Sequence, residues 1–292
     1  MLAGAPRAPG RRRAGDPVVT ASGDLRVVLI TDEVASGVEE GIEFARAHGI
    51  GEIAIRGIAE ENVVALAGPR IDALEATLRH AGVGVTALLS PLFKAYLPGR
   101  AGPSLDDPNV PQFSVDGSEH LALRDRLPAL AARLGAAHVR VFSFLTGAGA
   151  EARTGDDDVR AHLRALEQSH PGLYAVENED VCFVQTVEQL ERCTAETGLR
   201  AMLDPANDWY VTREPVAPRI TPALVARLAD VHVKDMAGEE CVPLGDGQVD
   251  WPAILARLRE LGYRGTLTHE PHIGRDRDGV ARAVEALHRL LE

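Results

Sequence analysis

The sequence predicts a single (β/α)8 barrel, and three observations support this fold class. Short apolar, β-branched segments alternate with amphipathic segments eight times between residue 25 and residue 292. Strict alternation of strands and helices indicates a parallel sheet, and eight such repeats fit a closed barrel of about 250 residues. The first predicted strand is followed by TDEVASG, which lacks the G-x-G-x-x-G turn typical of a doubly wound nucleotide-binding sheet.

The predicted strands are apolar segments at 25–31, 52–56, 83–90, 137–144, 173–178, 199–204, 230–234 and 265–270. The predicted helices follow them at 37–49, 71–82, 118–135, 156–170, 186–198, 221–229, 251–262 and 277–292. Thr186 is a typical N-cap, and Gly198 is a typical C-terminal glycine of the same helix. Pro128 is expected to kink or interrupt the helix at 118–135.

Two parts of the chain do not follow this alternation. Residues 1–22 are basic and rich in Gly, Pro and Ala, and we expect a disordered tail before a barrel domain at 23–292. The three arginines at 11–13 precede no apolar segment, which argues against an export signal. The proline-rich stretch that follows the third strand is predicted to be a long surface loop, with Lys94 as a surface lysine.

Composition narrows the possible function classes. The chain has 31 Lys and Arg against 43 Asp and Glu, a net charge of −12, which disfavours binding to nucleic acid or to an anionic membrane. No apolar run approaches the ~20 residues that span a bilayer. The three cysteines form no C-x-x-C pair, which favours reduced thiols in a cytoplasmic protein.

Four segments in the second half of the chain carry a residue that can ligate a metal at the end of a predicted strand. They are AVEN with Glu177, AMLD with Asp204, VHVKD with His232 and LTHE with Glu270. The gaps of 27, 28 and 38 residues match βα units with their loops. We therefore expect the four side chains at neighbouring strand ends on the carboxyl rim, where barrel enzymes place their catalytic groups.

The alternation of side chains along a strand supports this placement. Each ionisable residue has on the opposite face an apolar neighbour that suits packing under the helices: Val176, Leu203, Val231 and Leu267. Taken singly, each ionisable residue could instead cap a helix or pair with an arginine. Together, three carboxylates would repel one another, and a divalent cation would relieve that repulsion. Three carboxylates and one imidazole suit Mn²⁺, Mg²⁺, Co²⁺ or Zn²⁺.

These residues also carry a family resemblance. With the run HVKD…VPLGDGQVDWPAILARLRELGYRGTLTHE, they resemble the xylose isomerase-like sugar phosphate isomerase/epimerase superfamily, whose members include tagatose epimerases, hydroxypyruvate isomerase and inosose dehydratase. The resemblance extends over about residues 25–290 through TDEVASGVEEGIEFARAHGIGEIAIR, LLSPLFK and VRVFSF. It implies a metal held by Glu177, Asp204, His232 and Glu270, with the two glutamates also beside the reacting carbons.

The chemistry that follows is proton transfer next to a carbonyl. A metal that binds a substrate carbonyl and a neighbouring hydroxyl would stabilise an enediolate, while Glu177 or Glu270 removes the α-proton and the other returns it. Return to a neighbouring carbon gives an isomer, return to the opposite face gives an epimer, and loss of a β-hydroxyl gives dehydration. We expect an isomerase or epimerase of a small carbohydrate or polyol, with a lyase or dehydratase on a cyclitol or keto-sugar as the alternative.

Five further residues are candidates for substrate binding: Asn207, Lys234, Glu179, Arg56 and His272. Many epimerases of the family have D-x-x-H where this chain has Asp204-Pro-Ala-Asn207, and an amide cannot shuttle a proton. Glu179 shares a face with Glu177 and is an acid/base candidate or a second-choice ligand. Lys234 either orients a substrate oxygen or pairs with Asp204 or Glu270.

The remaining polar residues near strand ends have simpler interpretations. Arg56 and Arg140 either contact substrate hydroxyls or phosphate, or form buried salt bridges. His138 and His269 are expected to be structural. The GDGQ segment at 245–248 is expected to form a turn before the next helix.

The fold also allows two other functions. The apurinic endonuclease branch of the fold needs more histidines at strand ends than His232 alone, and the net charge opposes it. A barrel without catalysis would bind a sugar or a protein partner. A homo-oligomer is compatible with the resemblance.

Overall fold

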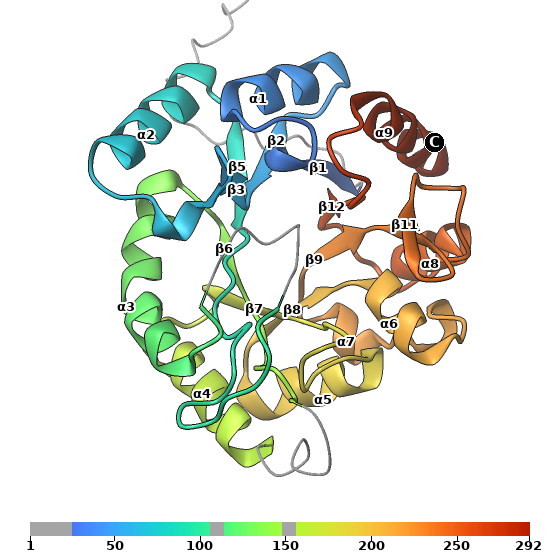
Figure 1. The fold of residues 1–292 in the computed structure, drawn as a ribbon. Helices are drawn as coiled ribbons and strands as arrows, with labels where there is room; N and C mark the ends of the chain where they lie inside the picture. The colour runs from blue at the N-terminus through green and yellow to red at the C-terminus, as the bar shows by residue number, and fades with distance from the viewer. Residues whose placement is uncertain (1–24, 106–113, 148–155) are drawn as a thin grey trace, which may run out of the picture.

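The computed structural model describes residues 25–105, 114–147 and 156–292, and in it eight parallel strands close into a barrel surrounded by helices (Figure 1). The order around the barrel is β1-β12-β9-β8-β7-β6-β5-β2, so chain order is kept and the last strand pairs with the first. The strands are β1 (Arg26–Ile30), β2 (Glu52–Ile55), β5 (Gly84–Leu88), β6 (His138–Val141), β7 (Tyr174–Glu177), β8 (Arg200–Leu203), β9 (Leu228–Val233) and β12 (Thr266–His269). The predicted (β/α)8 barrel is confirmed.

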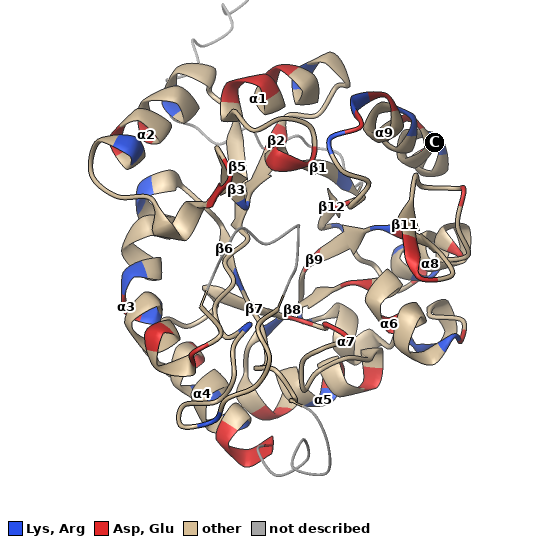
Figure 2. Ribbon diagram, in the orientation of Figure 1, with Lys and Arg blue, Asp and Glu red and all other residues tan. Residues whose placement is uncertain are grey.

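The helices form the outer ring seen in Figure 1, and acidic and basic residues are interspersed over them (Figure 2). They are α1 (Val38–Ala47), α2 (Pro69–Ala81), α3 (Gly117–Leu134), α4 (Asp156–Ser169), α5 (Val187–Thr197), α6 (Pro205–Thr212), α7 (Pro222–Val225), α8 (Trp251–Glu260) and α9 (Arg277–Leu291). The loops contain two small pairs of antiparallel strands: β3 (Gly57–Ile58) with β4 (Glu61–Asn62), and β10 (Asp235–Ala237) with β11 (Glu240–Val242). Within the described ranges, no helix has both the length and the apolar character needed to cross a membrane.

The region between β8 and β9 differs from the prediction. The predicted helix at 221–229 is only the short α7, because residues 228 and 229 already belong to β9. The helix α6 directly after β8 was missed. Asp204 is its N-cap, with a side chain that accepts the backbone N–H groups of Ala206 and Asn207, and Pro205 occupies the first helical position.

Pro128 does not interrupt its helix, contrary to expectation, because α3 is continuous from Gly117 to Leu134. A proline inside a helix leaves the carbonyl four residues before it without its usual N–H donor. That carbonyl belongs to Arg124, and the Tyr174 hydroxyl donates a hydrogen bond to it at 3.4 Å. A side chain from the first residue of β7 therefore replaces the missing backbone donor.

The loop after β5 is also different from the prediction. Its first residues turn inward rather than lying on the surface, and Phe93 stacks on Phe144 with ring centroids 4.3 Å apart. Lys94, expected on the surface, is 7% exposed. Apolar packing of its neighbours fixes it beside the barrel mouth. The predicted tail at 1–22 lies outside the described residues, as do the middle of this loop and residues 148–155.

Candidate metal centre

The two faces of the strands separate as the alternation predicts. Ala175 and Met202 belong to a small apolar cluster inside the barrel. Val176, Leu203, Val231 and Leu267 belong instead to the large core between the barrel and the helices. The ionisable residues that alternate with this second set therefore point into the barrel.

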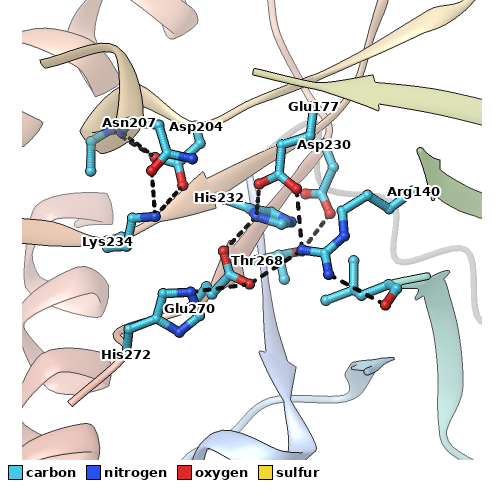
Figure 3. A network of polar contacts seen from close by, with 12 residues as sticks. Arg140, Glu177, Asp204, Asn207, Asp230, His232, Lys234, Thr268, Glu270 and His272 are labelled. Carbon is cyan, nitrogen blue, oxygen red and sulfur yellow. Dashed lines mark hydrogen bonds and ion pairs between the residues drawn. The ribbon is translucent and has the colours of Figure 1, made fainter. Parts of the chain in front are cut away.

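Glu177, Asp204, His232 and Glu270, called the quartet below, converge at the carboxyl end of the barrel (Figure 3). One potential ligand atom from each residue lies within 4.8 Å of the others, and all four residues are buried. His232 Nδ1 lies 2.8 Å from Oε1 of Glu177 and 2.8 Å from Oε2 of Glu270. The imidazole thus holds the two glutamates on either side of a single nitrogen.

Asp204 is fixed by its backbone as well as by its side chain. Its N–H donates to Asn178 Oδ1 and its carbonyl accepts from Asn178 Nδ2, both at 2.8 Å. Oδ1 of its carboxylate caps α6, accepting from Ala206 N at 2.8 Å and Asn207 N at 2.9 Å. Oδ2 faces Lys234, whose Nζ is 2.7 Å away. Oδ1 of Asp204 therefore stabilises the start of α6, and Oδ2 faces the other residues of the site.

The protonation of the quartet follows from burial and charge together. Burial opposes a charged His232, but Glu177 and Glu270 outweigh it and raise the pKa of the imidazole well above its usual value. Burial would raise the pKa of each glutamate, yet His232 and the neighbouring Arg140 lower both pKa values. Burial raises the pKa of Asp204, although Lys234 opposes the shift. A proton on His232 therefore balances part of the negative charge of the glutamates.

The donor set fits a divalent cation. Three buried carboxylates and one imidazole nitrogen can all reach one point, and oxygen with imidazole ligands suits Mn²⁺, Mg²⁺, Co²⁺ or Zn²⁺. Nδ1 of His232 faces the carboxylates, so it is the ring nitrogen available as a ligand. A cation at this point would replace the proton of His232 as the positive charge that balances the glutamates.

Two arginines surround the quartet. Arg140 NH1 lies 3.1 Å from Glu177 and 3.5 Å from Glu270. Arg56 NH1 lies 3.2 Å from the same oxygen of Glu270, and its other nitrogens contact Asp32 at 3.0 Å and Glu33 at 2.6 Å. Both arginines thus form the buried salt bridges that were one of their two predicted roles.

Asp32 and Glu33 were missed by sequence reasoning. They lie in a short 3-10 turn (Thr31–Glu33) directly after β1. Glu33 is 3% exposed, and Arg56 and His272 offset its burial and lower its pKa to about 2. The signal was available, because two acidic residues directly follow a predicted strand, the same pattern that identified the quartet.

His272 lies beside the quartet and is held there by Glu33. Its Nδ1 lies 3.0 Å from Glu33 Oε1, and its backbone N–H donates to Glu33 Oε2 at 3.1 Å. Nε2 is left 3.7 Å from Glu270 Oε1. The first and last βα loops are therefore joined beside the quartet.

The other side of the site is a chain of hydrogen bonds and ion pairs that runs from Lys234 to Lys94. Lys234 Nζ donates to Asn207 Oδ1 at 2.8 Å, and Asn207 Nδ2 donates to Glu179 at 3.1 Å. Glu179 is paired in turn with Lys94 at 3.0 Å. Asn207 therefore has a fixed orientation, with an acceptor toward Lys234 and donors away from it. Lys94 is a third residue at the site that sequence reasoning missed.

The other predicted positions do not belong to the quartet. His138 and His269 are buried, and their structural role stays a prediction. The GDGQ turn wraps around Asp235, whose carboxylate accepts the backbone N–H groups of Gly245 and Gly247 at 2.9 and 3.1 Å. A Cβ at Gly247 would collide with that carboxylate, so the turn requires glycine there.

The model of one protein family, the xylose isomerase-like TIM barrel, matches residues 41–291. The chain belongs to this family. No curated protein sequence matches it.

Solved structures with the same fold include three informative examples. The IOLI protein with a bound zinc atom has 16% identity and a TM-score of 0.68, covering 91% of this chain and 98% of that one. D-Allulose 3-epimerase from Methylomonas sp., solved with D-allulose, has 14% identity and a TM-score of 0.67, covering 92% and 98%. A fusion of a xylose isomerase-like barrel with 4-hydroxyphenylpyruvate dioxygenase has 20% identity and a TM-score of 0.67; the match covers 91% of this chain but only 42% of the fusion. Identities this low indicate a shared fold.

Proposed function

We propose that this protein is a divalent-metal-dependent isomerase or epimerase of a small carbohydrate or polyol. The observation that carries the proposal is the position of Glu177 and Glu270, two buried carboxylates that approach one nitrogen of His232 from different strands. Structural neighbours that include a sugar epimerase and a zinc-binding barrel support it.

The quartet would hold the metal, which would supply polarisation of a substrate carbonyl and of the adjacent hydroxyl. The lowered pKa values keep Glu177 and Glu270 ionised at neutral pH, the form that can accept a proton. One glutamate would take the α-proton and, as the carboxylic acid so formed, return it to the neighbouring carbon of the enediolate. For return to the opposite face, the first glutamate would pass its proton to solvent, and the other would take a proton from solvent and deliver it. The face or carbon that receives this proton decides between epimer and isomer.

The surrounding polar residues would bind and orient the substrate. Glu179 would accept a hydrogen bond from a substrate hydroxyl. The amide group of Asn207 already donates to Asn178 and to Glu179, so Asn207 would contact a hydroxyl through Oδ1. Lys234 would contact a substrate oxygen next to Asp204, and its distance of 2.7 Å from Asp204 Oδ2 supports this role. On the opposite side, His272 presents Nε2 toward Glu270, and Arg56 fixes the orientation of that carboxylate.

The test is turnover by the metal-loaded protein of a panel containing ketoses, keto-inositols and hydroxypyruvate, with products followed by mass and NMR. A product of unchanged mass supports the proposal. A product lighter by one water would instead support the dehydratase alternative on the same site. The absence of turnover across the panel, with metal bound, would reject both. A cytoplasmic location and a homo-oligomer stay predictions of the sequence.

A further inference from the structure

A cavity lies at the opposite end of the barrel from the quartet, and the proposed function does not use it. Its volume is about 510 Å³, and its lining comes from the first residues of several strands, including Arg26 of β1, Glu52 of β2 and Arg200 of β8. Because all the strands are parallel, their first residues are at the end away from the quartet. A volume of this size is typical of small-molecule sites.

The charges around this cavity are unbalanced. Three arginines line it but only one carboxylate, Glu52, which pairs with Arg26 at 2.8 Å. Among the described residues, neither Arg200 nor Arg264 has a carboxylate within ion-pair distance, and the one side-chain bond of Arg264 goes to the carbonyl of Tyr263. A protein with a net charge of −12 thus places two uncompensated guanidinium groups around one cavity.

The inner wall of the cavity has unused hydrogen-bonding capacity. His138 lines it and is 2% exposed. Its Nε2 has no hydrogen-bond partner in the described part of the chain, although it lies within ion-pair distance of Asp230, 3.7 Å from Oδ2. Buried polar groups without a partner are rare and commonly indicate an additional ligand or ion. Thr266, which also lines the cavity, already donates a hydrogen bond from its hydroxyl to Oδ1 of Asp230 at 2.7 Å.

We propose that this cavity binds a small oxyanion, a carboxylate or a phosphate ester, between Arg200 and Arg264 with His138 at its inner end. Guanidinium groups recognise these anions through paired, charge-assisted hydrogen bonds. A doubly charged ligand, such as a phosphate monoester or a dicarboxylate, would balance both arginines. The site is separate from the quartet and does not depend on the proposed reaction.

The test is a titration of the full-length protein with inorganic phosphate and, separately, with succinate, at constant ionic strength. NMR would follow the arginine Nε–H signals and the His138 imidazole. We expect saturable shifts at Arg200, Arg264 and His138 with at least one probe, and the probe that saturates identifies the class of anion. We expect the double variant Arg200→Gln/Arg264→Gln to weaken binding at least about tenfold. The matched control is Arg282→Gln, an exposed arginine of α9, which should leave binding unchanged.

The variant Arg200→Lys keeps the charge and should retain part of the affinity, which separates loss of binding from loss of fold. Shifts that increase linearly with both probes would overturn the proposal. If the double variant and Arg282→Gln weakened anion binding equally, the proposal would be overturned as well. The loss of affinity would then reflect the overall charge of the protein and not a site at Arg200 and Arg264.

Discussion

Lys234 places its ammonium group 2.7 Å from Oδ2 of Asp204, the one carboxylate oxygen of that residue that does not cap α6. A cation held by the quartet would use the same oxygen. A bound metal and Lys234 would therefore compete for Asp204, while the lysine also has Asn207 as an alternative partner at 2.8 Å.

The variant Lys234→Met is expected to bind a divalent metal more tightly at pH 8, by about tenfold or more, because a positive charge beside the cation is removed. Turnover should fall, since the substrate contact is lost. Isothermal titration with Mn²⁺ measures the affinity, and Lys94→Met is the control because Lys94 pairs with Glu179 outside the quartet. Weaker metal binding by Lys234→Met would contradict this account of the site.

Metal binding should release protons at pH 7. The pKa of His232 is raised well above its usual value by Glu177 and Glu270, so the imidazole carries a proton that the metal must displace. We expect about one proton per metal, measured from the dependence of the binding enthalpy on the ionisation enthalpy of the buffer. Affinity should rise with pH over the same range. A binding enthalpy that does not depend on the buffer would show that His232 is not a ligand.

Glu33 should stabilise the metal-free protein above pH 4.5. Its pKa is about 2 in the fold against 4.5 for an ordinary glutamate, so its contribution is complete above 4.5 and disappears as the pH falls toward 2. We expect Glu33→Gln to lose on the order of 3 kcal/mol of unfolding free energy at pH 7, and about half as much at pH 3. Urea unfolding measures both values.

The control for Glu33 is Glu60→Gln, which removes an exposed carboxylate paired with Arg275 and should change the unfolding free energy little. A Glu33→Gln deficit that is the same at both pH values would mean that Glu33 acts through packing and not through its charge.

The Tyr174 hydroxyl should contribute measurably to stability, because it replaces the backbone donor that Pro128 removes from α3. Tyr174→Phe is expected to lower the unfolding free energy by about 1 kcal/mol. Metal affinity should stay the same, because the hydroxyl contacts α3 and not the site. Tyr210→Phe, on the half-buried face of α6, is the matched control. If both variants had the same unfolding free energy, the hydrogen bond from Tyr174 to the Arg124 carbonyl would make no measurable contribution to stability.

The fold and the quartet could be predicted because they depend on patterns that the sequence repeats. Alternating strands and helices fix a parallel barrel, and the period of two along each strand decides which side chain points inward. Glu177, Asp204, His232 and Glu270 follow from those two rules without any knowledge of loop conformation.

The rest of the site depends on contacts that no periodicity encodes. Lys94 is buried because the loop after β5 folds back onto the barrel, with Phe93 stacked on Phe144. Glu33 meets His272 across 239 positions of the sequence. The helix after Asp204 is a different case, since an Asp-Pro pair is a regular helix start and was available as a signal.

The central claim is that Glu177 and Glu270 move protons at a metal-loaded quartet, and solvent isotope incorporation tests it most directly. The metal-loaded protein would be incubated in D₂O with the ketose or keto-cyclitol that it turns over, and deuterium at the α-carbon would be followed by NMR. We predict incorporation with the wild-type protein, its loss after chelation of the metal, and a reduction of at least about a hundredfold in Glu177→Gln or Glu270→Gln. Turnover without deuterium incorporation, or incorporation that both variants retain, would contradict the account.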